Sequence, residues 1–216
     1  MTRIARRVLA MSVLSVPACV QTPGPTTEPA PAVATTQNDT TGRVLVPPGY
    51  GTLRQDDISL HIDAGTVLVR ALPLEESILR LLTPDSYRAL RDLKESDRAR
   101  INAISRRYGG RPVSVWLISF YGVEPAARFT PGDVTVTSGG REFRPYDILP
   151  LTVGFGEQRL RQRETQSAVY VYDGDIEVDQ PVSLMYEGGV DDSWEDTLQR
   201  IERERAMVRA RAGKPN

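Results

Sequence analysis

The sequence of 216 residues has very few of the side chains that enzymes use for covalent or metal chemistry. It contains one cysteine, Cys19, and one histidine, His61. A lone cysteine cannot build a cysteine-based zinc site, and a catalytic histidine needs a positioned nucleophile or acid, which no motif spacing supplies here. A glycine-rich phosphate loop and a Gly-x-Ser-x-Gly motif are also absent. We therefore expect a non-catalytic protein without a cofactor or a bound metal.

The sequence also lacks an excess of charge and a long apolar run. With 27 Lys and Arg against 28 Asp and Glu, the net charge is −1, so no overall field would attract nucleic acid or an anionic surface. The apolar stretch 8–16 is far shorter than the roughly 20 residues that a membrane-spanning helix needs. We expect no nucleic-acid partner and no membrane-spanning segment.

Residues 1–18 have the layout of a secretory signal peptide. Arg3, Arg6 and Arg7 form a positive front, the apolar stretch 8–16 follows, and small or medium side chains lead up to Cys19. Such a segment is removed during export and is not part of the fold. The sequence therefore predicts a protein of the cell envelope.

The stretch Val16-Pro17-Ala18-Cys19 resembles the lipobox of bacterial lipoproteins. This resemblance implies that Cys19 is lipidated, becomes the mature N-terminus and anchors the protein to a membrane. Val20 and Gln21 follow it, rather than the aspartate that retains many such proteins at the inner membrane, so we expect the outer membrane, facing the periplasm. The alternative is an ordinary signal peptide cleaved after Ala18, with Cys19 a free thiol.

Residues 19–42 are predicted to be a disordered tether between the anchor and the domain. They contain four prolines among Thr, Ala and Gln and have no aromatic residue: Pro23, Pro25, Pro29 and Pro31. Such a composition offers too little apolar side chain to form a core. We expect the folded domain to begin at residue 43.

Short segments of alternating polarity predict a β-sandwich over residues 43–190. The segment 113–121 is apolar on both faces, so both faces must be covered. We expect Trp116, Ile118 and Phe120 to be buried on one face, and Val115 and Leu117 on the other. The expected strands are 58–62, 66–72, 113–121, 134–136, 142–146, 167–172 and 182–186.

Two helical segments are predicted to cover this sheet. The first is an insertion over 75–108, in which Thr83 and Pro84 start a helix and a break is expected at 94–97. Its apolar stripe is Tyr87, Leu90, Ile101 and Ile104. The second is a C-terminal helix over 191–212, which starts at Ser193 with a capping-box-like pattern and leaves the domain beyond Glu202. Its apolar stripe is Trp194, Leu198 and Ile201.

These elements indicate a mainly β fold with helices, an antiparallel, immunoglobulin-like β-sandwich with a helical insertion and a C-terminal helix. The stretch from Phe129 to Val136, followed by 167–172, is vaguely similar to immunoglobulin-like domains of bacterial lipoproteins. The similarity lies in the spacing of strands and turns, and it assigns no functional residue.

Three possible functional sites have little support from their residue patterns. His61 lies on the polar side of an alternating strand, which favours a solvated side chain. The acidic run 173–179 fails as a calcium loop, because Val178 stands where the EF-hand glycine would be and Leu184 where its glutamate would be. Three arginines of the stretch 154–166 could meet an anionic polymer or a lipid headgroup, but a solvated surface is favoured: Arg159, Arg161 and Arg163.

Two classes of function follow from these features. The first is a non-catalytic envelope lipoprotein, presented on a tether, whose domain binds a protein or glycan partner or serves assembly. The alternative is an envelope hydrolase that uses paired carboxylates, which leave no sequence signature. Its candidate acids are Glu124, Asp147 and Glu187. Missing enzyme motifs favour the first class.

Overall fold

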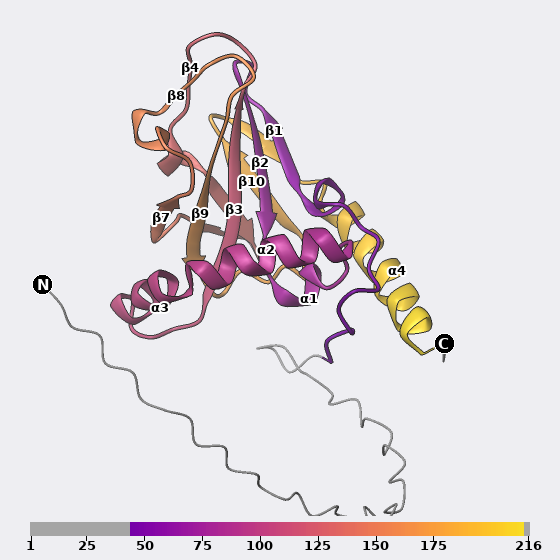
Figure 1. The fold of residues 1–216 in the computed structure, drawn as a ribbon. Coiled ribbons are helices and arrows are strands. Elements are labelled where there is room, and N and C mark those ends of the chain that lie inside the picture. The colour runs from indigo at the N-terminus through magenta and orange to yellow at the C-terminus, as the bar shows by residue number, and fades with distance from the viewer. Residues whose placement is uncertain (1–43, 214–216) are drawn as a thin grey trace, which may run out of the picture. The chain divides into compact units, whose positions relative to one another are not determined.

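The computed structural model describes residues 44–213, so the predicted signal peptide, Cys19 and the tether lie outside the described residues. Most of the described chain forms two antiparallel sheets and four α-helices (Figure 1). The mainly β architecture with helices, one of them C-terminal, is confirmed. No helix among residues 44–213 is long and apolar enough to cross a membrane.

The larger sheet has five strands in the order β1-β2-β3-β9-β7, with every neighbouring pair antiparallel. β1 and β2 form a hairpin, and in its turn Asp63 Oδ1 accepts a hydrogen bond from Gly65 N at 2.9 Å. Its strands are β1 (Leu60–Asp63), β2 (Val67–Pro73), β3 (Val113–Gly122), β9 (Thr165–Asp173) and β7 (Asp147–Pro150).

The smaller sheet has four strands in the order β11-β10-β5-β6, and two short strands form a third, separate ribbon. The four strands are β11 (Gly189–Asp191), β10 (Val182–Tyr186), β5 (Thr135–Ser138) and β6 (Arg141–Phe143). The ribbon pairs β4 (Ala127–Arg128) with β8 (Arg159–Leu160). The described chain also contains three 3-10 turns, of which the first precedes β1 and the other two lie between strands: η1 (Gln55–Ile58), η2 (Pro131–Asp133) and η3 (Phe155–Glu157).

Strand β3 lies at the centre of the larger sheet, and the expected burial of Trp116, Ile118 and Phe120 on one face and of Val115 and Leu117 on the other is confirmed. On the inner face Trp116 lies 6.4 Å from Trp194 between ring centroids, and Phe120 lies 5.7 Å from Tyr186 of the smaller sheet. Such aromatic contacts stabilise a core beyond the area that they bury. The inner face therefore carries the core that the two sheets share.

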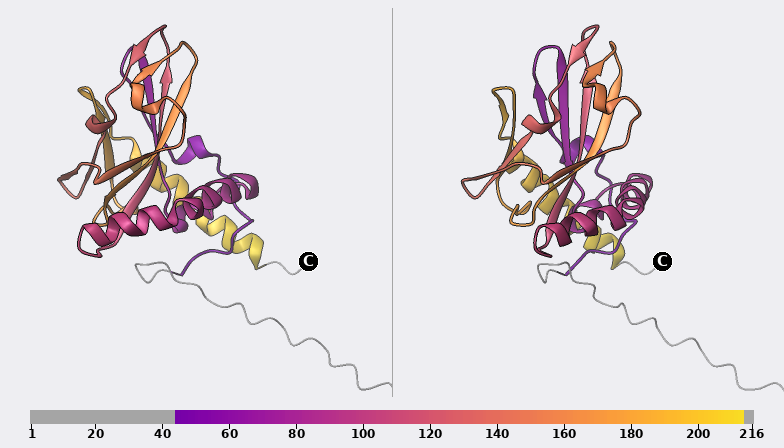
Figure 2. Two further views of the ribbon diagram at one scale, coloured as in Figure 1. Left: turned by 60° about the vertical axis from the view of Figure 1, so that its left-hand side comes forward. Right: turned by 90° about the vertical axis from the view of Figure 1, so that its left-hand side faces the viewer.

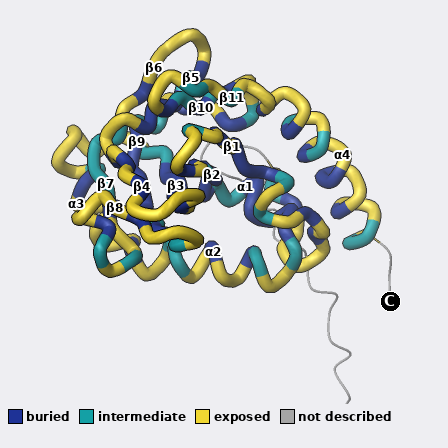
Figure 3. The backbone as a smooth tube through the Cα atoms, turned by 90° about the horizontal axis from the view of Figure 1, so that it is seen from above, coloured by how far each residue is buried: buried dark blue, intermediate teal, exposed yellow. Residues whose placement is uncertain are grey.

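The helical insertion is also confirmed, and it consists of three helices. They are α1 (Glu76–Leu79), α2 (Pro84–Ser96) and α3 (Arg98–Arg107), and the break between the last two falls at Asp97. The four predicted stripe residues are buried. Seen from above, the larger sheet lies between α2 and the smaller sheet, so the insertion covers the outer face (Figure 3).

Helix α4 (Trp194–Ala212) covers the inner side, with Trp194 and Ile201 fully buried. The expectation that it leaves the domain beyond Glu202 is wrong, because Glu204, Arg205 and Val208 are also buried. The Glu204 carboxylate accepts hydrogen bonds from the Thr52 amide and hydroxyl, at 2.9 and 3.0 Å. Charged side chains of the last turns are thus paired with the start of the domain, which sequence spacing cannot reveal.

The free edge of β1 is closed by the smaller sheet. The His61 amide donates a hydrogen bond to Asp191 Oδ2 at 2.6 Å. Gly189 permits this approach, because a Cβ there would lie 2.7 Å from the Ile62 Cγ2 atom. Closing an edge in this way removes a template for strand pairing between molecules.

Candidate binding face

The outer face of the larger sheet is divided into two halves along its strands. The lower half lies under α2 and α3, and its side chains are buried: Leu72, Val115, Leu117, Val169 and Val171. The upper half, called the open face below, lies beyond the helices, which gather at one end of the strands (Figure 2). The open face consists of His61, Asp63, Leu68, Arg70, Ser119, Tyr121, Thr165 and Ser167.

Strand register places these side chains in two rows. In the upper row, Tyr121 stands opposite Leu68 on one side and Thr165 on the other. In the lower row, Ser119 stands between Arg70 and Ser167. Because directly opposed residues of antiparallel strands share a face, each row forms a continuous strip across the strands.

The open face contains a shallow hollow of about 470 Å³, which is within the size range of ligand sites. Leu68 and Tyr121 are 39% and 36% exposed and form its apolar part. Its polar lining comes from five residues around this apolar part: His61, Asp63, Arg70, Ser119 and Thr165. The hollow thus offers an apolar centre with charged groups on one side and hydroxyl groups on the other.

Hydrogen bonds fix the polar side chains around this centre. Arg70 Nη1 lies 2.8 Å from Asp56 Oδ1, an ion pair that holds the guanidinium at the β1 side. On the other side the hydroxyls of Ser119 and Ser167 are 2.8 Å apart, and the Ser167 amide donates to Thr152 Oγ1 at 2.8 Å. Side chains held in this way lose little conformational freedom when a partner binds.

The sequence did not predict this face. The segment 113–121 is apolar on both faces in sequence, yet Tyr121 at its end is partly exposed. The available signal was the serine at 119, which interrupts the apolar row, together with the polar residues that alternate along β1. His61, expected to be solvated, is exposed as predicted, but it lines the hollow.

The three candidate acids of the alternative hydrolase are not gathered into one site. Asp147 pairs through Val171 with Val115, whereas Glu124 follows the far end of β3 at Gly122. Val115 and Gly122 are seven residues apart along β3, so Asp147 and Glu124 are separated by roughly 20 Å in the strand direction. Glycosidase carboxylates stand roughly 5–10 Å apart, so these two cannot form such a pair.

Two of the three candidate acids have a local partner. Asp147 forms an ion pair with Arg107 at 3.4 Å, and Glu187 accepts a hydrogen bond from the Tyr186 hydroxyl at 3.0 Å. Glu124 is exposed in the connection between β3 and β4. None of these contacts positions an acid against a second carboxylate.

The acidic run 173–179 spreads its carboxylates over different partners. Asp173 accepts a hydrogen bond from the Tyr146 hydroxyl at 2.5 Å, and this bond lowers the pKa of the Asp173 carboxyl and raises the pKa of Tyr146. Asp175 pairs with Arg141 at 3.0 Å, and Asp179 with Arg205 at 2.8 Å. Residues 44–213 contain no group of three or more metal-ligating side chains that could hold an ion.

Acidic residues lie beside two of the three arginines of this cluster. Arg159 and Arg161 line a hollow together with Glu157 and Glu164, and Glu164 accepts a hydrogen bond from the Arg161 amide at 2.7 Å. A mixed surface of this kind attracts a polyanion weakly.

Comparison of the chain with known protein families, with curated proteins and with solved structures finds no match.

Proposed function

We propose that this protein is a non-catalytic lipoprotein of the cell envelope, anchored through Cys19, whose open face binds a partner. The observation that supports binding is that the helices cover only half of the outer face of the larger sheet. Apolar and polar side chains are exposed side by side on the other half. A surface on which Leu68 and Tyr121 stay exposed beside fixed hydroxyl groups is typical of recognition surfaces.

The partner that the open face fits best is an extended segment of an envelope protein. The hollow is shallow, and its lining comes from the neighbouring strands β1, β2, β3 and β9. Tyr121 and Leu68 form its centre. Aromatic and aliphatic anchors surrounded by polar groups are the usual composition of a protein-binding patch. A glycan strand is the other outcome that the test below distinguishes.

The anchoring part of the proposal comes from the sequence. A lipidated Cys19, followed by the proline-rich stretch 19–42, would hold the domain at the membrane while leaving it free to meet a partner. Val20 and Gln21 favour the outer membrane, facing the periplasm. The immunoglobulin-like plan belongs to the same proposal, and it is supported by two antiparallel sheets that share one core.

An envelope hydrolase is the less supported alternative. It would need two acids that face each other across a cavity, whereas Glu124 and Asp147 lie at distant levels of the larger sheet. Binding without chemistry explains the described arrangement with fewer assumptions.

The anchor is tested with a Cys19→Ser chain, by membrane fractionation and uptake of labelled fatty acid. Loss of label and release of the domain into the soluble fraction are expected. A wild-type chain that is soluble and unlabelled would leave an ordinary exported protein.

Partner binding is tested with a chain in which Leu68 and Tyr121 are both alanine. We expect this variant to lose the envelope proteins that co-purify with the wild type, whereas Val190→Ala, an exposed position on β11, retains them. Co-sedimentation with purified peptidoglycan that is lost in the double variant would instead identify a glycan. Equal retention by all three chains would remove the open face from the proposal.

A further inference from the structure

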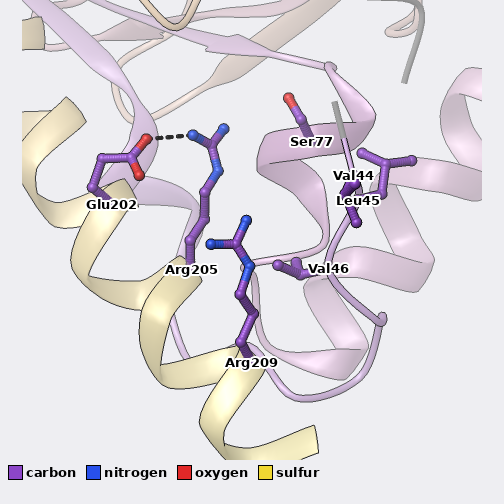
Figure 4. A pocket seen from close by; sticks show the side chains of 7 residues that line it. All are labelled: Val44, Leu45, Val46, Ser77, Glu202, Arg205 and Arg209. Atoms are coloured by element: carbon purple, nitrogen blue, oxygen red, sulfur yellow. Dashed lines mark hydrogen bonds and ion pairs between the residues drawn. The ribbon is translucent and has the colours of Figure 1, made fainter. Parts of the chain in front are cut away.

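The buried charge at the second cavity of the domain is neutralised within the chain. This cavity has a volume of about 360 Å³ and lies between the start of the described chain, α1 and α4 (Figure 4). Arg205 Nη2 lies 2.8 Å from Asp179 Oδ1, and Arg205 Nη1 lies 2.5 Å from Glu202 Oε1. Two carboxylates thus satisfy this cation, which does not call for a ligand.

Both edges of the larger sheet are closed to strand pairing. At β1 the carboxylate of Asp191 accepts a hydrogen bond from the edge amide of His61. At β7 the amide of Ile148 donates to Asp147 Oδ1 at 2.9 Å, and Pro150 has no amide hydrogen to donate. An edge with free amides and carbonyls can pair with a strand of another chain, and native folds block such edges. Within the described chain, the larger sheet thus offers a partner no open edge.

Strand β6 forms an edge of the smaller sheet, and no hydrogen bond within residues 44–213 occupies the outer side of this edge. The two-residue turn of Gly139 and Gly140, both with positive φ, joins β6 to β5. Such a turn makes Ser138 and Arg141 a hydrogen-bonded pair, so the next residue, Glu142, directs its amide and carbonyl away from β5. Seen from above, β6 lies at the margin of the domain, so these backbone groups face outwards (Figure 3).

Two opposite charges stand unpaired along this edge. Glu142 and Arg144 are two residues apart, so both side chains point to the outer face of the smaller sheet, while Phe143 between them is buried. Glu142 and Arg144 are exposed, and neither side chain takes part in a hydrogen bond or an ion pair within residues 44–213. Because Arg144 precedes Pro145, extended backbone is favoured there too. The edge therefore presents one acid and one base at the spacing of a strand.

We infer that β6 pairs with the β6 of a second copy of this chain, about a two-fold axis at Phe143. In this antiparallel pairing Glu142 of each copy stands opposite Arg144 of the other, and their outward backbone groups form the ladder of hydrogen bonds. A shift by two residues would place Glu142 against Glu142, or Arg144 against Arg144. A shift by one residue would oppose an outward-facing residue to Phe143, whose backbone groups are bonded to β5. The charges and the backbone together select one register.

The pairing would join the two smaller sheets into one sheet that contains the four strands of each copy. Pro145 ends the edge after Arg144, because proline has no amide hydrogen to add to the ladder. Both copies use the same surface, so the assembly closes at two chains. An interface of so few residues is small, and we expect a weak dimer. Because β6 contributes no residue to the open face, this inference and the proposed function can fail separately.

The first test reverses the charges in a full-length chain with Cys19→Ser, which removes the proposed lipid anchor. Sedimentation velocity measures the equilibrium between monomer and dimer at protein concentrations up to about 1 mM. Glu142→Lys and Arg144→Glu should each weaken dimerisation about tenfold, because each places like charges opposite each other. Combining both changes in one chain should restore the dimer, and so should mixing the two single variants. Glu124→Lys, the same change at an exposed acid between β3 and β4, should have no effect.

Disulfide trapping tests the register, because the Cys19→Ser chain contains no other cysteine. Chains with Glu142→Cys and chains with Arg144→Cys are mixed and treated with oxidised glutathione. Opposed residues of a hydrogen-bonded pair lie about 5.5 Å apart between Cα atoms, within the range of a disulfide. The mixture should yield a crosslinked dimer that retains one pair of Glu142 with Arg144. Either chain alone should not, since its two cysteines would stand diagonally, about 7–8 Å apart.

Three results would overturn the inference. The first is a wild-type domain that remains monomeric up to about 1 mM, and the second is a dimer that the charge reversals leave unchanged. The third is a different contact, shown by crosslinking of the Glu142→Cys chain with itself or with Val190→Cys on the opposite edge of the smaller sheet. Thermal unfolding of each variant verifies that it is folded.

Discussion

The covered and open halves of the outer face belong to the same strands, yet they differ in what lies above them. Leu117 and Tyr121 stand on one face of β3, four residues apart. Leu117 is buried in the half that α2 and α3 cover, whereas Tyr121 is 36% exposed. The comparison shows that the pattern of a strand determines which side chains share a face, and that the position of the helix determines which of them become core.

The inner face has no open half, so the largest loss of stability is expected there. Trp116→Ala should lower the free energy of unfolding by about 3–5 kcal/mol, because it removes a fully buried ring beside Trp194. Chemical denaturation measures this loss. A loss below about 1 kcal/mol would mean that the core of the two sheets is not packed as described.

The covered half should behave as core. Leu117→Ala is expected to cost about 2–4 kcal/mol, since the helices above it cannot fully fill the vacated space. The same denaturation experiment applies, with Leu117→Met as a control that keeps the volume and should cost less than about 1.5 kcal/mol. If Leu117→Ala were no more costly than a surface change, the two halves would not differ in packing.

The buried tyrosines of the inner side should make the stability of the fold depend on alkaline pH, which the exposed Tyr121 should not do. Burial raises the pKa of Tyr170, Tyr172 and Tyr186. Above pH about 10 these hydroxyls stay protonated in the fold but ionise in the unfolded chain, so the native state binds more protons and stability falls as pH rises. Each tyrosine contributes a slope of at most about 1.4 kcal/mol per pH unit.

Denaturation midpoints measured from pH 8 to pH about 11 test this slope. Tyr172→Phe, which removes one buried hydroxyl, should make the decline shallower. A stability that rises over this range would contradict the burial of these side chains.

The smallest effect on stability is expected on the open face. Tyr121→Ala should change the free energy of unfolding by less than about 0.5 kcal/mol, as surface substitutions usually do. A loss near that of Leu117→Ala would show that the open face is incompletely covered core rather than a recognition surface. Partner binding, measured as above, should instead fall strongly.

Local patterns predicted much of the fold. Alternating residues located β3 and its two buried faces, and the Thr83-Pro84 start and the break near Asp97 located the helices. Four short strands were not predicted, because segments of two to four residues show too little periodicity to stand out: β4, β7, β8 and β11. The docking of the last turns of α4 was also missed, since the contact between Thr52 and Glu204 joins residues 152 positions apart.

The candidate sites depend on such distant contacts even more. Sequence alternation could place Tyr121 and Leu68 on a sheet face, but it could not show that the helices stop short of them. Residues of α1 and α4 line one cavity only because both helices pack beside the start of the domain. Neither arrangement has a signature at fixed spacing.

The central claim, that the open face is a binding surface, is tested most directly by crosslinking in living cells. A photo-reactive amino acid is placed at Tyr121 in one chain and at Val190, an exposed residue of the smaller sheet, in another. We expect a discrete adduct from position 121 that protease digestion removes, and none from position 190. Adducts of equal yield from both positions, or none from position 121 while the chain is folded and anchored, would contradict the account.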